Sequence, residues 1–387
     1  MRHQPTAIEQ VLQQMPWGLF DRLVEKHRAD ERVRGFDSRD HFLTLLASAL
    51  GGYQGLRRTA AALAPNGGPL RLMGGQPPAR STLSDAARNR PAALFVELLQ
   101  HMLACVPQRR LRREVTQVVR LIDATQFNAG ARAKAWLGLY RDQPAAKLHL
   151  VYDPRAERPV LFEITSARVN DISAAKDLLP IEPGATYVFD LGYYDFGWWA
   201  KLRAAGCNFV TRLKQNTRFR MTEERPVSGK GAVLSDRIGR LPERLAQSRR
   251  NPFDTPGREV VIRLDTGKRL RLFTNDLTSP ADIIADLYKE RWQIELFFKW
   301  VKQNLKITRF IGTSENALRS HIAVALIAYL LVHHNPVRQT TDRPACIILL
   351  VIAANLFVRR PLAELLNPAP QTKPPPSPQL MLLPCKT

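Results

Sequence analysis

The sequence contains few cysteines, and none of them is close to another. Cys105, Cys207, Cys346 and Cys385 are spread along 387 residues and form no CxxC pair. A structural zinc site needs closely spaced thiolate or imidazole ligands, so this spacing argues against one. Thiols without paired spacing are typical of a reducing compartment, and we expect the protein in the cytoplasm.

Long hydrophobic runs are also missing. The two most apolar stretches, residues 322–332 and 346–358, are both shorter than the roughly 20 residues that cross a bilayer. His333, His334 and Arg343 lie between them, and the first ten residues show no secretory signal pattern. We therefore expect two buried helices and no membrane partner, with a membrane hairpin as the alternative.

Acidic residues are the third scarce group. The chain has 35 Asp and Glu against 57 Lys and Arg, a formal net charge of +22. This imbalance favours a polyanionic partner, DNA or RNA before a membrane surface. Basic runs at residues 109–113, 155–158 and 268–271 distribute the charge, which suits a long nucleic-acid footprint. A generally basic soluble protein is the alternative.

Residues 1–110 show helical periodicity. Apolar spacing predicts helices over residues 8–24, 41–50 and 92–103, with Asp37 or Ser38 capping the second. Two shorter helices, at 56–63 and 81–90, are separated by a turn-rich segment. The second carries Arg88 and Arg90, and the pair could read DNA as a helix-turn-helix or form part of a plain helical bundle.

The pattern changes near residue 115. Short apolar runs predict strands at 118–122, 148–152, 160–164, 187–189 and 209–213, with a helix over 195–205. Residues 215–257 are polar and irregular, and a hairpin follows at 259–264 and 269–274. This order predicts an α/β domain with a mixed sheet over 115–335, interrupted by a β-rich insertion at 215–274. Helices over 336–366 and a disordered Pro-rich tail over 367–387 complete the expected organisation.

One helical segment, residues 288–302, carries an unusual set of polar side chains. Tyr288, Arg291, Glu295 and Lys302 are separated by offsets of three, seven and fourteen residues. At about 100° per residue these positions share one side of a helix, and the opposite side is apolar. One carboxylate among phosphate-binding groups suits metal-dependent chemistry on a nucleic-acid backbone. A solvated charge pair between residues four apart is the alternative.

Two further carboxylates end predicted strands. Asp123 closes the run at 118–122 and Asp190 follows the strand at 187–189. A helix packed at that sheet edge can bring Glu295 alongside, and three crowded carboxylates repel one another unless a cation joins them. Oxygen ligands favour Mg²⁺ or Mn²⁺, and two such ions about 3.5–4 Å apart support phosphodiester chemistry. Each Asp alone could equally be a turn former.

At these residues the chain resembles the insertion-sequence DDE transposases of family four, whose signature is Tyr-Arg-Glu-Lys. The similarity covers about residues 118–329 and includes LYKERWQIELFFKWVKQNL, LFTND before it and FIGTSENALRSHIAVALIAYLL after it. It also includes the residues from Asp190 to Tyr193 and the strand NFVTRLKQN. The N-terminal helical region looks like theirs as well.

The resemblance implies an RNase H-like core, with Asp123, Asp190 and Glu295 as ligands of two Mg²⁺ or Mn²⁺ ions. It implies that Tyr288, Arg291 and Lys302 hold double-stranded DNA at the transposon's terminal inverted repeats. The implied reaction is strand cleavage at the element's end followed by attack of the 3′-hydroxyl on target DNA. The implied assembly is a homodimer on DNA in the bacterial cytoplasm, associated with the nucleoid, with residues 1–110 binding the transposon end.

Some residues depart from that family pattern. Leu191 stands where the family often has Arg, and residues 216–274 contain no Trp. Phe253 is then the candidate in the insertion for stacking on an extruded base, which leaves cleavage through a hairpin open.

Other side chains have less specific roles. Trp198 and Trp199 are expected to bury against the sheet, and His149 to be structural. Asn170 and Asp171 precede a predicted helix and are expected to cap it, with a place near the metals as the alternative. Arg212 and Lys214 end a strand beside the expected site and are either DNA contacts or solvated charges. The candidate DNA-binding residues are therefore Tyr288, Arg291, Lys302, Arg212, Lys214, Arg88 and Arg90.

Four functions remain in competition at this point. The same three carboxylates would serve a transposase or an RNase H-like nuclease without strand transfer. An inactive copy acting as a DNA-binding repressor is a third hypothesis, although all three acidic residues are present. A basic membrane-associated protein, the fourth, depends only on the apolar residues between 322 and 358.

Overall fold

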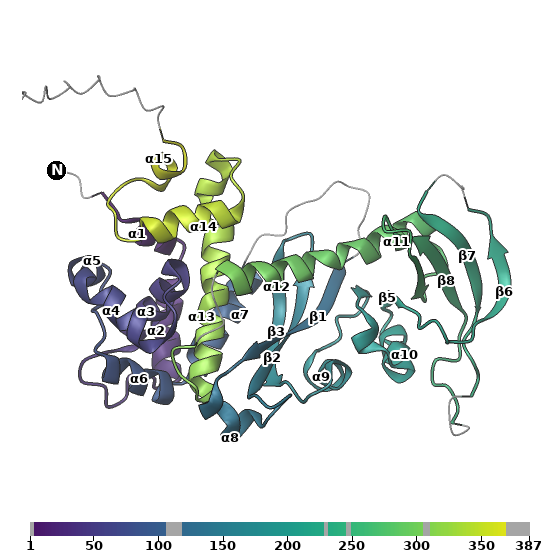
Figure 1. Cartoon of the computed structure of the whole chain (residues 1–387), viewed down its shortest axis with the longest axis horizontal. Helices are drawn as coiled ribbons and strands as arrows, with labels where there is room; N and C mark the ends of the chain where they lie inside the picture. Colours follow the sequence, from purple (N-terminus) through teal and green to yellow (C-terminus); the bar gives the residue numbers. More distant parts are fainter. Residues whose placement is uncertain (1–3, 106–117, 228–230, 245–248, 305–309, 369–387) are drawn as a thin grey trace, which may run out of the picture.

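The computed structural model describes residues 4–105, 118–227, 231–244, 249–304 and 310–368. The molecule is elongated: helices form one end, a mixed sheet forms the middle, and the strands of the insertion form the other end (Figure 1). The basic run at 109–113 and almost all of the Pro-rich tail lie outside the described residues. The predicted α/β class with a mixed sheet is confirmed, while the domain boundaries stay predictions.

The N-terminal part is helical, as predicted. Its helices are α1 (Ala7–Leu12), α2 (Trp17–Lys26), α3 (Ser38–Gly51), α4 (Gly55–Leu63), α5 (Gly67–Leu72), α6 (Arg80–Asn89) and α7 (Ala92–Cys105). The single helix expected over 8–24 is wrong, because Pro16 begins a second helix there. Asp37 caps α3 in a capping box with Asp40, which settles the choice between Asp37 and Ser38.

A single nine-stranded sheet follows, in the order β3-β2-β1-β4-β5-β9-β8-β7-β6. Strands β1, β4 and β5 are parallel, and every other neighbouring pair is antiparallel. The strands are β1 (Val119–Asn128), β2 (Ala145–Asp153), β3 (Arg158–Ser166), β4 (Thr186–Val188), β5 (Asn208–Arg212), β6 (Arg220–Arg225), β7 (Val233–Arg240), β8 (Gly257–Arg263) and β9 (Arg269–Thr274).

Two predictions made from the sequence for this sheet are wrong. β1 continues to Asn128, so Asp123 lies in the middle of a strand and not at its end. The segment expected to be irregular contains β6 and β7, while the predicted hairpin is confirmed as β8 and β9. Because β9 pairs with β5, the insertion extends the central sheet.

Part of the hydrophobic core packs on one face of the sheet. On one face an aromatic cluster that includes Phe189, Trp199 and Phe209 packs beneath α10 (Phe196–Ala204). Nearby lie α9 (Asp171–Leu178) and the short helix η3 (Leu191–Tyr193). Another short helix, η2 (Ala131–Ala133), precedes α8 (Lys134–Leu137) after β1.

The helical segment over 281–304 crosses the sheet (Figure 1). It consists of α11 (Ala281–Glu290) and α12 (Trp292–Asn304), which meet at Arg291. There the amide of Arg291 bonds to Tyr288 O and the amide of Ile294 bonds to Arg291 O, both across three residues. The sequence predicts one uninterrupted helix here, but the structure has two helices joined by a tighter turn at Arg291.

Helix α13 (Glu315–His333) packs against α3, α7 and α14 (Ala345–Ala354), and α15 (Leu362–Leu366) closes the described part. The stretch Glu315–Thr340 is long and apolar enough to cross a membrane by length and composition, but 83% of its most apolar window is buried inside the protein. Its place between helices accounts for its apolar residues, as predicted for the first apolar run.

Candidate active site

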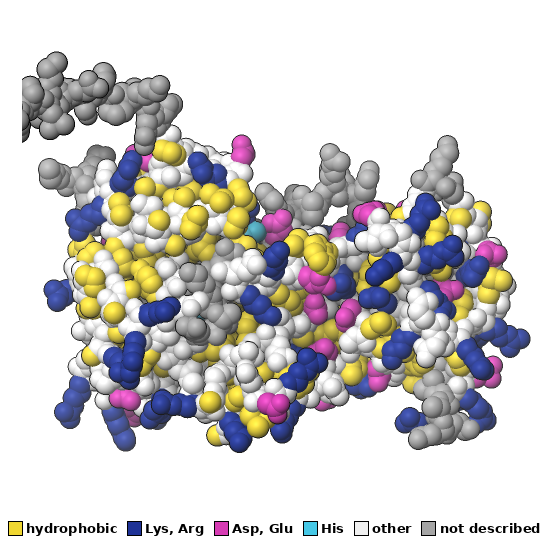
Figure 2. All heavy atoms as spheres, in the orientation of Figure 1, with side chains coloured by type: hydrophobic (Ala, Val, Ile, Leu, Met, Phe, Trp, Pro, Cys, Tyr) yellow, Lys and Arg dark blue, Asp and Glu magenta, His cyan; other side chains and the backbone are white. Residues whose placement is uncertain are grey.

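Three carboxylates from separate parts of the fold line one open hollow of about 480 Å³. Asp123 comes from β1, Asp190 follows β4, and Glu295 lies in the first turn of α12. Figure 2 shows acidic side chains gathered at the centre of the molecule, over the sheet and below α12. The rest of the wall includes cationic side chains: Arg291, Lys299 and Lys302.

Asp123 is the most deeply placed of the three. The pKa of its carboxyl is raised to about 7, mainly by burial and also by the neighbouring charges of Asp190 and Glu295. The Ala124 amide, which donates to Oδ1 at 2.8 Å, and Arg291 act in the opposite direction. At neutral pH this carboxyl is therefore only partly ionised, because the nearby positive charge does not offset its burial and the neighbouring negative charges.

Asp190 caps the short helix η3 and accepts a hydrogen bond from the Gly192 amide at 2.8 Å. A methyl group on Gly192 would lie 3.0 Å from Asp190 Oδ1 and 3.1 Å from Asp171 Oδ2, so these two carboxylates flank the glycine. Asp171, the first residue of α9, also pairs with Lys147 Nζ at 2.9 Å. The second expectation for Asp171, a place beside the carboxylate site, agrees with this geometry.

Tyr193 was not assigned a role from the sequence. Its side chain is fully buried, and its hydroxyl has no hydrogen-bond partner within the described ranges. Burial raises its pKa well above 10, and Asp171, Asp123 and Asp190 add to the effect. The hydroxyl therefore stays protonated and lies among the same acidic groups. No sequence pattern separates it from an ordinary core tyrosine.

Arg291 lies between two of the carboxylates. Its Nη2 is 2.6 Å from Glu295 Oε1, and its Nη1 is 3.8 Å from Asp123 Oδ2. The charge pair considered as the alternative for this helix is thus present, but it is part of a site with a third residue from β1. The guanidinium also lies over the ring of Tyr288, 5.7 Å from its centroid.

The remaining residues of the helical motif surround this centre. Lys302 lines the hollow with its Nζ 5.1 Å from the centroid of the Phe127 ring, and burial lowers its pKa while Asp123 raises it. Tyr288 is buried beside Arg291 and does not belong to the wall of the hollow. Trp292, next along the chain, is 58% exposed, so an open aromatic face lies beside the site.

The candidate DNA contacts outside this helix divide into three groups. Burial raises the pKa of Tyr288, and the charge of the neighbouring Arg212 acts against this rise. Lys214 is exposed, with its Nζ 4.5 Å from the Tyr194 ring centroid. Arg88 is exposed on α6. Arg90 is a wrong candidate, because its guanidinium is buried, donates to Phe36 O at 2.7 Å and pairs with Asp30.

The aromatic side chains that the sequence singled out are buried. Phe253 is buried and contacts Trp199, Phe209 and Phe273, so it offers no face to a base and that expectation is wrong. Trp198 and Trp199 are buried, as predicted. His149 is buried too and bonds Thr165 Oγ1 at 2.9 Å, in agreement with a structural role.

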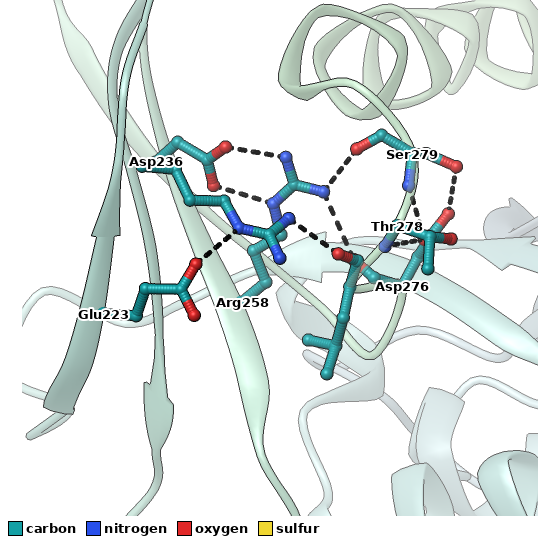
Figure 3. A network of polar contacts seen from close by, with 8 residues as sticks. Glu223, Asp236, Arg258, Asp276, Thr278 and Ser279 are labelled. Carbon is teal, nitrogen blue, oxygen red and sulfur yellow. Dashed lines mark hydrogen bonds and ion pairs between the residues drawn. The ribbon is translucent and has the colours of Figure 1, made fainter.

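A buried polar network joins the insertion to the start of α11 (Figure 3). Arg258 on β8 donates two hydrogen bonds of 2.7 Å to Asp236 on β7 and a third to Ser279 O. Asp276 accepts from the amides of Thr278 and Ser279 at 2.9 Å. Ser279 lies two residues before the start of α11, so this network holds the chain at the point where the helix carrying Tyr288 leaves the sheet.

The donor chemistry of the hollow suits a hard divalent cation. Its acidic groups offer oxygen ligands only, and burial together with the charges of Asp190 and Glu295 raises the pKa of Asp123. Among the residues that the structure describes, no three His, Cys, Asp or Glu side chains form a ready-made cage. Arg291 contributes the positive charge between Asp123 and Glu295 instead. The carboxylate set fits the cation, provided that Arg291 moves aside.

A mixed sheet with acidic residues in a hollow edged by cations is typical of proteins that act on a phosphate backbone. The chain belongs to the "Transposase DDE domain" family, whose model matches residues 115–331. A second model, "Domain of unknown function (DUF4372)", matches residues 3–76.

Named relatives of the chain are transposases of insertion sequences or similar proteins. The chain is 36% identical over 296 residues to "Putative transposase y4zB" of Sinorhizobium fredii, which covers 76% of this chain and 82% of the relative. It is 28% identical over 255 residues to "Probable transposase for insertion sequence element IS5377" of Geobacillus stearothermophilus, covering 65% and 66% of the two chains. The transposase of IS231D from Bacillus thuringiensis is 24% identical over 265 residues, or 56% and 55%.

One solved structure also aligns with this chain: the piggyBac transposase in a synaptic complex with hairpin DNA. The TM-score is 0.49 and the sequence identity is 10%, over 96% of this chain and 86% of the other. A similarity of that size does not establish a common fold.

Proposed function

We propose that this transposase cleaves DNA at the ends of an insertion element and joins the freed 3′-hydroxyl to target DNA. Asp123, Asp190 and Glu295 would hold two Mg²⁺ or Mn²⁺ ions, which when bound activate a water or 3′-hydroxyl and stabilise the leaving oxygen. The observation that carries the proposal is the arrangement of these three carboxylates around one hollow, with Arg291 and Lys302 in the same wall.

The protein's own cations position the DNA in this proposal. Arg291 and Lys302 hold phosphates beside the reacting bond, since guanidinium and ammonium groups bind phosphate oxygens strongly. Tyr288 supports the guanidinium of Arg291 from below, with 5.7 Å between the arginine Cζ and the ring centroid. Lys299 adds positive charge at the mouth of the hollow.

The assignment to an RNase H-like core and to family four is part of the proposal. The order β3-β2-β1-β4-β5 with β1, β4 and β5 parallel supports it, because the carboxylates then lie on β1, after β4 and on a later helix. So does the Tyr-Arg-Glu-Lys spacing of Tyr288, Arg291, Glu295 and Lys302. The protein would act as a homodimer on double-stranded DNA, within the bacterial cytoplasm and associated with the nucleoid.

Strand transfer is tested apart from cleavage. Purified protein and Mg²⁺ are incubated with a supercoiled target and a labelled duplex that already ends at the element's boundary with a 3′-hydroxyl. We expect label joined to the target, and none from a matched duplex ending in a 3′-deoxy nucleotide. Cutting of an intact end without joining of the pre-cut end would indicate a nuclease, and binding without either reaction would indicate a repressor.

A further inference from the structure

A second hollow, separate from the one that the carboxylates line, is edged by arginines. It has a volume of about 760 Å³ and lies where α4 and α6 face η2, α8 and the start of α13. α6 and α8 lie on either side of the N-terminal end of α13 (Figure 1). Five arginines from both parts of the molecule line it, and we call it the arginine cavity: Arg57, Arg58, Arg80, Arg88 and Arg132.

These arginines are available for a ligand. All five are exposed, and none has an ion-pair or hydrogen-bond partner of its side chain within the part of the chain that the structure describes. Five like charges around one hollow repel one another, and a polyanion relieves that repulsion. The one acidic residue in the wall, Glu315, is already paired with Arg319 at 2.8 Å.

Helix α6 presents one side to the cavity. Arg80, Ser84 and Arg88 are spaced four residues apart and line the hollow, while Leu83 and Ala87 are buried on the other side. α6 is thus anchored by apolar contacts and offers two guanidiniums and a hydroxyl in a row. This arrangement gives a place in the fold to the basic second helix of the expected reader pair, with Arg88 exposed and Arg90 in the core.

The opposite wall is rigid and carries further positive potential. The indole N–H of Trp136 donates to Thr313 O at 3.1 Å, which ties α8 to the turn before α13. Ser314 caps α13, a helix of 19 residues whose positive end therefore borders the cavity beside Arg132.

The chemistry of the cavity selects its occupant. Small-molecule sites are mostly apolar with a few polar groups, so five guanidiniums exceed what one small anion needs. Arginine forks match phosphate oxygens, and successive phosphates of a nucleic-acid strand would meet several of them in turn. We propose that the arginine cavity holds the phosphate backbone of duplex DNA next to the element's end. This inference depends on the proposed function only in taking that DNA as the polyanion.

The position of the cavity along the fold sets where that contact falls. Asp123 and Asn128 are five residues apart on β1, about 17 Å at roughly 3.3 Å per residue. Arg132 follows just beyond the end of β1. Because Arg132 lies beyond that end of β1, the cavity would contact phosphates away from the bond that is cut. The N-terminal helices and the segment after β1 would then grip one duplex together, because both contribute arginines.

The test uses the full chain in EDTA, so that no strand is cut, and a duplex carrying the element's terminal repeat. Arg80→Gln/Arg88→Gln removes two charges from the cavity, and Arg22→Gln/Arg71→Gln removes two exposed charges from the same helical part outside it. Binding is measured against salt, and phosphate contacts are mapped by ethylation interference. Thermal melting shows that both variants remain folded.

We expect the cavity variant to lower the slope of log K against log salt by about 1.8, since each phosphate contact on duplex DNA contributes about 0.9. Interference should disappear at phosphates away from the bond that is cut, and the slope change should also appear with random duplex, because phosphate contacts read no sequence. The control variant should change the slope much less and leave the interference pattern intact.

Equal slopes for the two variants, or an unchanged interference pattern, would overturn the inference. These results are independent of catalysis. Normal cleavage by the cavity variant with unchanged binding would refute the cavity and leave the proposed function intact. Loss of the interference in a protein that never cleaves DNA would support the cavity and refute the proposed function.

Discussion

Arg291 and Glu295 form an ion pair of 2.6 Å across the junction of α11 and α12, and the same guanidinium lies 3.8 Å from Asp123. The arginine therefore occupies the space between two of the three carboxylates. We infer that a divalent cation and Arg291 compete for these oxygens. When a cation binds, the released guanidinium becomes free to hold a phosphate beside it.

Removing this guanidinium should affect two ligands in opposite directions. Arg291→Ala should bind Mn²⁺ more tightly in the absence of DNA, because the competing charge is gone. It should bind duplex DNA more weakly, with a salt slope lower by about 0.9 for one lost phosphate contact. Calorimetric titration with Mn²⁺ and salt-dependent DNA binding measure the two effects. Lys289→Ala, an exposed cation on α11 paired with Asp286, is the control. Weaker Mn²⁺ binding by Arg291→Ala would contradict the competition.

Metal binding should stabilise the folded protein without DNA. A ligand at a hundred times its Kd adds about 2.7 kcal/mol, so saturating Mg²⁺ should raise the melting temperature by a few degrees. Asp190→Asn should lose most of this rise, whereas Asp21→Asn, an exposed carboxylate on α2, should keep it. Differential scanning calorimetry measures the shift. An equal rise in both variants would place the bound metal elsewhere.

Acid should weaken the packing between the helical part and α13. Burial lowers the pKa of His41 to about 3 and that of His321 to about 4, against 6.5 for an ordinary histidine. The unfolded chain therefore takes up more protons as the pH falls below 6.5, and the free energy of unfolding falls. From pH 7 to 5 each buried histidine should remove about 2 kcal/mol.

The substitution His41→Leu isolates this effect. The variant should lose about 2 kcal/mol less stability than wild type between pH 7 and 5, measured by urea unfolding at both values. His101→Leu, an exposed position on α7, should behave as wild type. The other titrating groups are common to all three proteins, so the difference in their pH-dependent loss of stability reports on the substituted histidine. Identical pH dependence in wild type and His41→Leu would show that His41 is accessible to protons in the folded state.

The network in Figure 3 should be sensitive to the loss of one partner. Arg258→Met leaves Asp236 buried without its two hydrogen bonds, and breaking such a pair costs about 3–5 kcal/mol. The double variant Arg258→Met/Asp236→Leu should recover most of that loss, since no charge is left unpaired. Urea unfolding of the two single variants and the double variant gives the coupling. Costs that simply add would mean that water reaches Asp236.

The helical motif could be predicted from the sequence because its information is local. Residues at fixed offsets share one side of a helix whatever surrounds it, and only the tightening at Arg291 escaped notice. Asp190 was found for a similar reason, since a short apolar strand ends just before it. The hairpin of β8 and β9 follows from its turn residues.

Features set by distant contacts could not be predicted. β1 continues past Asp123 through Ala124, Thr125 and Gln126 because β2 pairs with it there, and no local pattern in the sequence indicates that partner. The sequence predicts Arg90 as an exposed basic residue at a helix end, but Phe36 and Asp30, more than fifty residues away in the chain, hold it in the core. Phe253 is buried by the aromatic cluster of the sheet, which forms only in the folded chain.

The most direct test of the central claim compares two carboxylate variants on the same helical segment. Glu295→Gln removes a metal ligand of the proposed site on α12, and Asp286→Asn removes an exposed carboxylate on the preceding helix, α11. Each is incubated with Mg²⁺ and duplex DNA carrying the element's terminal repeat, and binding is measured in parallel.

We predict that Glu295→Gln binds the duplex nearly as wild type but cuts it at least about a thousandfold more slowly, since a lost ligand removes the stabilisation of the leaving oxygen. Asp286→Asn should cut normally. Cleavage at the repeat boundary by Glu295→Gln at the wild-type rate would contradict the account, and so would an equal loss of binding and cutting.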